Sequence, residues 1–102
     1  MLLPDVNVLI YAHRVDSPEH TDYADWVRRL TASHEPFAMS ELVVVGFLRI
    51  VTNRRAFQHP TPSPVALDFI DEICGRPGCR LVRPGPAHLG ICLLYTSDAA
   101  DE

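Results

Sequence analysis

Residues 2–12 read LLPDVNVLIYA, an apolar run in which an acidic residue follows the first three positions. A carboxylate among apolar side chains is costly unless it is paired, hydrogen-bonded or bound to a cation, so Asp5 requires an explanation. Asp5 or Asn7 could cap the helix that follows, because both side-chain types accept backbone N–H groups at helix starts. Alternatively, Asp5 lies at the carboxyl edge of a parallel sheet, where ligands bind in open α/β folds.

The composition indicates one small soluble domain. The chain has 102 residues, 47% hydrophobic and 22% charged, which is ordinary for a globular protein. No apolar run reaches ~18 residues and no basic leader precedes the first strand, so we expect neither a membrane span nor a signal peptide. A cytoplasmic protein with no membrane partner follows. The net charge of −4 gives no general attraction to nucleic acid, and the three cysteines are interpreted as free thiols.

Apolar periodicity and turn signals divide the chain into alternating strands and helices. Ser-Pro pairs at residues 17–18 and 63–64 are typical helix starts, and Ser40 with Glu41 predicts another. Alternation of this kind predicts a parallel sheet built from right-handed crossovers. The predicted strands are 2–4 (buried), 37–39 and 80–82, and the predicted helices are 6–12, 18 to the break at 34–36, 40–53, 63–74 and one from residue 87.

Residues 92–102 read CLLYTSDAADE and continue neither a helical stripe nor a strand pattern. This segment resembles the in-frame translation of a sequencing adapter. It is therefore predicted to be a non-native tail, and the fold is assigned to residues 1–91 alone.

Three blocks of sequence resemble a known family. They are LPDVNVLIYA at residues 3–12, SEL at 40–42, and GFLR at 46–49 together with Asn53. Their order and spacing are similar to those of PIN-domain ribonucleases, in particular the VapC toxins of bacterial toxin–antitoxin pairs. The resemblance covers residues 1–91 and implies a partial PIN domain, a three-layer α/β/α fold with a short parallel sheet that is incomplete at the C-terminus.

The resemblance implies roles for individual residues. Asp5 matches the first metal-binding, catalytic acid of the family, and Glu41 matches the second. The supporting polar positions of the family match Asn7, Ser40, Arg49 and Asn53. The resemblance also implies an RNA substrate, a cognate antitoxin peptide and a homodimer.

The chemistry explains why two distant acids would act together. Hydrolysis of an RNA phosphodiester requires a nucleophilic water and a counter-charge for the phosphate, and divalent cations supply both. Mg²⁺ prefers oxygen ligands and is often held by one or two carboxylates, with Mn²⁺ as an alternative. Since parallel strands bring their carboxyl ends to one edge, Asp5 and Glu41 are predicted to converge there.

The chain departs from the family after residue 91. The third and fourth acids of the family would follow this point, and Asp98, Asp101 and Glu102 match no family motif. The parent protein is therefore predicted to be a magnesium-dependent ribonuclease, and this chain to be poorly active.

Other interpretations stay open at this point. Asp5 could be the nucleophile of a haloacid-dehalogenase-like phosphohydrolase, although those enzymes want a second Asp where this chain has Asn7. A partner-binding module without chemistry is also compatible, because the apolar faces around Trp26 and Phe47 exceed what a partial sheet covers. Glu41 could simply favour a helix start, Asn53 could end the helix, and the histidines are predicted to lie on the surface or in loops.

Overall fold

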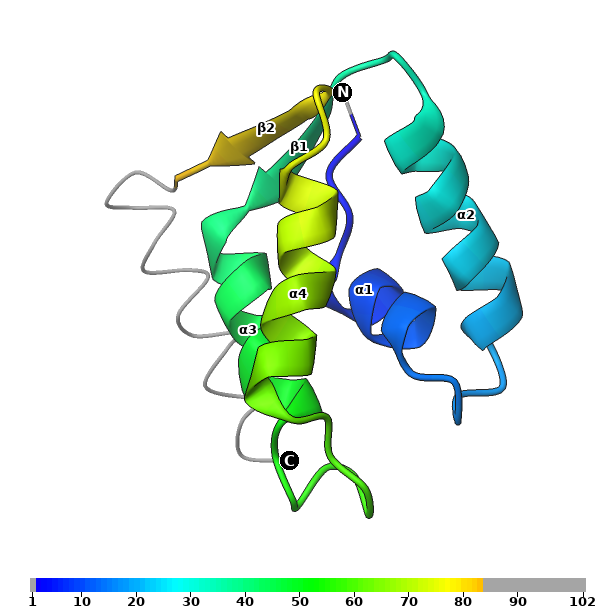
Figure 1. The fold of residues 1–102 in the computed structure, drawn as a ribbon, viewed down its shortest axis with the longest axis vertical. Coiled ribbons are helices and arrows are strands. Elements are labelled where there is room, and N and C mark those ends of the chain that lie inside the picture. The colour runs from blue at the N-terminus through cyan, green and yellow to red at the C-terminus, as the bar shows by residue number, and fades with distance from the viewer. Residues whose placement is uncertain (1, 84–102) are drawn as a thin grey trace.

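The computed structural model describes residues 2–83, in which a pair of helices precedes each of two strands (Figure 1). The elements are α1 (Val6–His13), α2 (His20–Ala32), β1 (Phe37–Ser40), α3 (Glu41–Val51), α4 (Ser63–Cys74) and β2 (Cys79–Val82). The predicted α/β class with a short parallel sheet is confirmed. Within the described range, no helix combines the length and the apolar character that crossing a bilayer requires. The predicted helix from residue 87 and the predicted tail lie outside this range.

The sheet is centred on β1. Strands β1 and β2 run parallel, in a register that pairs Phe37 with Cys79 and Ser40 with Val82. Leu2 forms a parallel bridge to Phe37. The N–H of Phe37 donates to the Gly78 carbonyl at 2.9 Å, and the next N–H, that of Ala38, donates to the Leu2 carbonyl at 2.8 Å. Because successive N–H groups of a strand point to opposite sides, β1 lies between the N-terminal segment and β2.

The predicted buried strand over residues 2–4 is wrong. Only Leu2 forms a bridge, and the side chains of Leu2 and Leu3 are 56% and 55% exposed. Two physical causes are visible within the described residues. The segment has a strand partner on the β1 side alone, and Pro4 has no N–H to donate to a ladder.

The core lies between the helices and the inner face of β1. Phe37, Met39, Phe47, Leu9 and Val51 are its largest fully buried side chains. Of the apolar faces considered for a partner, the one around Phe47 is covered, because α3 packs between α1 and α4. The Phe47 ring stacks on Phe69 with the ring centres 5.3 Å apart. Such burial is worth roughly 1.5 to 3 kcal/mol per large apolar side chain as transfer free energy.

The start of α4 agrees with the prediction from local sequence signals, whereas the start of α2 does not. Helix α4 begins at Ser63 with proline in its first turn and is followed by Gly75, as predicted. Helix α2 begins at His20, later than predicted, because Ser17 and Pro18 form a preceding turn. In that turn the Ser17 hydroxyl donates to the Glu19 carboxylate at 2.8 Å, and the Ser17 carbonyl accepts the His20 N–H at 3.1 Å.

Candidate active site

Three parallel segments end at the same edge of the sheet, which we name the carboxyl edge. Leu2 and Phe37 form a bridge, and the residues three positions after them in their two segments are Asp5 and Ser40. On the other side of β1, Val82 pairs with Ser40, so Arg83 follows at the same level. The carboxyl edge therefore carries Asp5, the Ser40–Glu41 junction and Arg83, one from each segment.

Asp5 is the N-cap of α1. Its Oδ1 accepts the N–H of Val6 at 2.7 Å, and the residue is exposed to solvent. The capping interpretation of this residue is thus confirmed. Capping leaves part of the carboxylate free to bind a ligand, because each oxygen has its own acceptor lone pairs and Oδ2 is a second ligand atom. The cap also fixes the direction in which the carboxylate is held.

Glu41 begins α3 directly after β1. An acid in the first turn of a helix is favoured by the positive end of the helix dipole. Ser40 is at the N-cap position and is buried, and its side chain makes no capping hydrogen bond. The Glu41 Oε2 lies 3.1 Å from Nε of Arg83, with 46% of the glutamate side chain and 80% of the arginine side chain exposed.

The four supporting residues divide into two groups. Asn7 and Ser40 are close in the chain to the two acids, in the first turn of α1 and at the end of β1. Arg49 is in the last turn of α3, about 12 Å along the helix axis from Glu41. Asn53 lies beyond that helix, where its side-chain oxygen accepts the Arg55 N–H at 2.9 Å. Only Asn7 and Ser40 therefore lie near the carboxyl edge.

The donor atoms at the carboxyl edge suit a hard divalent cation. Mg²⁺ is commonly held by one or two carboxylates, with waters and substrate phosphate completing its coordination. Two carboxylates match this requirement, whereas a structural zinc site takes four Cys, His or carboxylate ligands. Among residues 2–83, no three His, Cys, Asp or Glu side chains gather in a group that could hold a metal ion. The residues present fit a magnesium-type site with few protein ligands.

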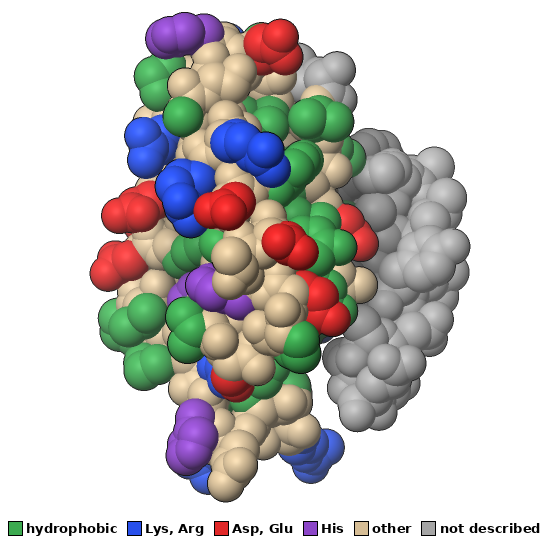
Figure 2. Space-filling model, turned by 90° about the vertical axis from the view of Figure 1, so that its right-hand side faces the viewer, with side chains coloured by type: hydrophobic (Ala, Val, Ile, Leu, Met, Phe, Trp, Pro, Cys, Tyr) green, Lys and Arg blue, Asp and Glu red, His purple; other side chains and the backbone are tan. Residues whose placement is uncertain are grey.

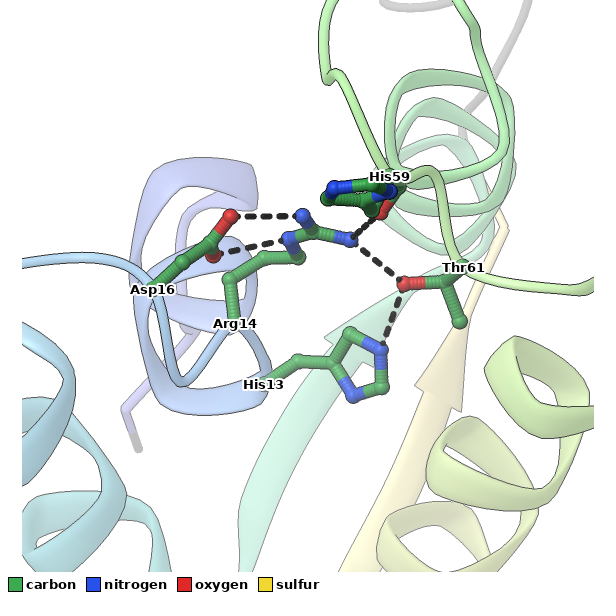
Figure 3. Close-up of polar contacts among 5 residues, drawn as sticks. All are labelled: His13, Arg14, Asp16, His59 and Thr61. Atoms are coloured by element: carbon green, nitrogen blue, oxygen red, sulfur yellow. Dashed lines mark hydrogen bonds and ion pairs between the residues drawn. The ribbon is translucent and has the colours of Figure 1, made fainter.

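A buried arginine next to α1 was not predicted from the sequence. Arg14 follows α1 and is 8% exposed, and its Nε and Nη2 donate to the two carboxylate oxygens of Asp16 at 3.0 and 2.7 Å. Its Nη1 donates to the His59 carbonyl at 2.8 Å and to the Thr61 hydroxyl at 3.2 Å (Figure 3). The guanidinium also lies 4.1 Å from the centre of the Phe57 ring. These contacts fix the loop after α3 onto the end of α1.

His13 belongs to the same cluster, so the prediction of a surface or loop position is wrong for it. Its Nε2 lies 3.0 Å from the Thr61 hydroxyl, and its ring packs against Phe47 and Phe69. Burial lowers the pKa of His13 below its usual value, and the neighbouring charge of Arg14 lowers that pKa further. His13 is therefore a neutral structural residue near pH 7.

The two cysteines in the described range are free thiols, as predicted. Burial raises the pKa of Cys74 to about 11, with Cys79 beside it contributing to the shift. A thiol with such a pKa stays protonated near neutral pH and is a poor nucleophile. Cys92 lies outside the described residues.

A hollow of about 220 Å³ opens between α1, α2 and α4. Buried apolar residues line it (Ala12, Val27 and Ile73), together with exposed charged residues (Arg28, Glu72 and Arg76). Figure 2 looks onto the α2 side of the molecule and shows acidic, basic and hydrophobic side chains interspersed there. The surface on this side is therefore mixed in charge and not uniformly basic.

Comparison with known proteins identifies relatives in mycobacteria, although no protein-family model matches the chain. The chain is 44% identical over 88 residues to VapC ribonuclease Mb2897 of Mycobacterium bovis, which covers 86% of this chain and 60% of the relative. It is 43% identical over 101 residues to ribonuclease VapC25 of Mycobacterium tuberculosis, which covers 99% of this chain and 70% of that protein. Ribonuclease VapC31 of M. tuberculosis is 42% identical over the same shares. The chain thus spans about 60% of the length of the M. bovis relative.

Proposed function

This chain belongs to the family of VapC ribonucleases, and from that premise we propose that the whole protein is a ribonuclease toxin that hydrolyses RNA phosphodiester bonds with a divalent cation. The observation that carries the proposal is the carboxyl edge, where the parallel register brings the ends of the Asp5 and Glu41 segments to one level. Open α/β folds bind their ligands at this edge.

Asp5 and Glu41 would hold the cation, Mg²⁺ or alternatively Mn²⁺, through carboxylate oxygens. The bound cation supplies a nucleophilic water near neutral pH and positive charge for the phosphate. The Val6 N–H holds Oδ1 of Asp5, which directs the carboxylate and leaves Oδ2 for the cation. Asn7 and Ser40 support the two acids, and Arg49 and Asn53 are kept as supporting positions at the far end of α3.

We also propose that the chain of 102 residues cleaves RNA slowly by itself. The carboxyl edge supplies two acids to the proposed site, and no group of three metal-binding side chains is found within residues 2–83. A reacting group misplaced by ~1 Å can cost ~10²-fold in rate, and a cation with two protein ligands is less firmly placed than one with three or four.

The proposed partners are RNA and a cognate antitoxin peptide in the cytoplasm, together with a second copy of the chain. The hollow between α2 and α4 supports peptide binding. It combines apolar walls with charges of both signs from Arg28, Glu72 and Arg76, which suit a segment that carries both apolar and charged side chains. If peptide binding were the whole function, the protein would need no cation, which separates the binding-module alternative from the ribonuclease.

Calorimetric titration with Mn²⁺, combined with cleavage of a fluorogenic RNA, tests the proposed function. We expect Mn²⁺ binding by the unmodified chain, and an affinity at least about tenfold weaker after Asp5→Asn or Glu41→Gln. Asp68→Asn is the matched control, because Asp68 is an exposed acid on α4. Residual RNA cleavage should fall with the metal affinity in the two edge variants.

Two results would contradict this proposal. Absence of any Mn²⁺-dependent heat would favour the binding module. A trapped phosphoryl group on Asp5 would instead favour the haloacid-dehalogenase-like alternative.

A further inference from the structure

Arg83 brings a positive charge to the carboxyl edge. Its Nε lies 3.1 Å from Oε2 of Glu41, the carboxylate assigned above to the cation. Its place follows from the sheet register, because Val82 pairs with Ser40 and Arg83 comes next in the chain. The guanidinium thus reaches the second acid from β2, while Asp5 approaches from the opposite side of β1.

We propose that Arg83 is an internal competitor of the divalent cation for the Glu41 carboxylate. The inference rests on the proposed metal site. In the metal-free protein the guanidinium neutralises Glu41, and the incoming cation must displace it from Oε2. Arg83 therefore lowers the metal affinity and makes that affinity depend on ionic strength.

The exposure of the pair allows this exchange. Arg83 is 80% exposed and Glu41 46% exposed, and a solvent-exposed ion pair of this kind contributes little net free energy. The guanidinium can therefore leave the carboxylate for water when a cation binds. Once displaced, it remains tethered near a doubly charged ion, and the repulsion between them persists at a distance of a few ångströms.

The neighbouring arginine of β2 provides a matched control. Arg80 is exposed, like Arg83, and lies in β2, the strand that Arg83 directly follows. Its Nη1 donates to the carbonyls of Pro77 and Cys79, at 2.9 and 3.2 Å, within its own turn. Removing the Arg80 charge changes the net charge by the same amount as removing the Arg83 charge, without removing an ion pair to Glu41.

The test is calorimetric titration of Mn²⁺ into the unmodified chain and its Arg83→Gln, Arg83→Lys and Arg80→Gln variants, at low and moderate salt. Arg83→Gln should bind Mn²⁺ roughly three- to tenfold more tightly at low ionic strength, and salt should shrink this gain. Arg83→Lys keeps the charge and should stay near the unmodified affinity. Arg80→Gln should change the affinity less than twofold, by roughly the screened effect of one distant charge.

The outcomes separate this inference from the function on which it rests. If the unmodified chain binds Mn²⁺, Glu41→Gln weakens the binding, and Arg83→Gln leaves it unchanged or weaker, the competition is overturned and the metal site stands. An equal gain in Arg80→Gln and Arg83→Gln would also overturn it, because the effect would then be general electrostatics. If neither the unmodified chain nor Arg83→Gln binds Mn²⁺, the metal site and the competition are both overturned.

Discussion

Arg14 and Arg28 illustrate how the surroundings of a residue decide what an ion pair is worth. Both arginines pair with an aspartate, at 2.7 Å for Arg14–Asp16 and 2.8 Å for Arg28–Asp25. The Arg14 side chain is 9% exposed and the Arg28 side chain 72% exposed. The Arg14 hydrogen bonds hold the pKa of Asp16 below its usual range. A buried guanidinium also satisfies neighbouring carbonyl and hydroxyl groups, whereas an exposed one competes with water.

Arg14→Met should lower the free energy of unfolding by about 1 to 3 kcal/mol. The substitution keeps much of the side-chain volume but removes the Arg14 donor from the His59 carbonyl and leaves the buried Thr61 hydroxyl with His13 as its remaining side-chain partner. Arg28→Met is the control and should change stability by about 0.5 kcal/mol or less. Urea denaturation followed by circular dichroism measures both. Equal losses in the two variants would show that burial of Arg14 contributes nothing.

Single residues could be predicted where a short-range rule applied. The capping position of Asp5 and the place of Glu41 at a helix start follow from residue types and neighbours. Arg14 escaped prediction because three of its partners are more than 40 residues away in the chain. Arg83 could have been found, because the edge rule that grouped Asp5 with Glu41 also applies to the residue after the third strand.

At the scale of elements, a glycine in α3 links the two helices that follow the candidate ligands. Gly46 is buried in the middle of α3, and a Cβ added to it would lie 3.6 Å from Cγ2 of Val6, an ordinary contact distance. Val6 begins α1 directly after Asp5, so the helices that carry Asp5 and Glu41 touch here. Close packing at this point helps keep the two helix starts in a fixed relation.

Gly46→Ala should raise the free energy of unfolding by about 0.5 to 1 kcal/mol, because alanine has the higher helix propensity and its methyl group fits. Gly78→Ala should have the opposite sign. A Cβ at Gly78 would lie 2.9 Å from the Glu35 carbonyl oxygen, so backbone must shift at a cost of about 1 to 3 kcal/mol. Thermal unfolding of both variants checks the signs. A destabilised Gly46→Ala would mean that α1 and α3 are closer than their contact distance indicates.

Helices and strands were predicted best where start and stop residues mark both of their ends in the sequence. Helix α4 has a serine–proline start and a glycine after its end, and its predicted limits agree with the structure. The first strand failed because strand formation depends on neighbours elsewhere in the chain, which a run of two leucines does not reveal. The parallel arrangement of β1 and β2 was predictable, since two helices, α3 and α4, separate them and form the crossover that parallel strands require.

At the scale of the whole molecule, the part of the chain that the structure describes leaves apolar side chains of its sheet exposed. Within residues 2–83, β2 is an edge strand, and its Leu81 and Val82 are 54% and 42% exposed. An edge strand presents unpaired N–H and C=O groups, and exposed apolar side chains beside them favour pairing with another strand. The proposed homodimer would cover such a surface, and β2 is where we expect the two copies to meet.

Light scattering after size-exclusion chromatography should therefore give a mass approaching twice the 11.4 kDa of one chain as the concentration rises. Leu81→Glu should return the mass to that of a single chain, because a charge on an edge strand opposes strand pairing. Val15→Glu is the control, since Val15 is 82% exposed and lies in the loop between α1 and α2, away from the sheet. A single-chain mass at every concentration would contradict the dimer. A dimer that survives Leu81→Glu but not Val15→Glu would instead place the contact at the loop between α1 and α2. In that case a charge at Val15 would disrupt the interface, whereas a charge on β2 would not.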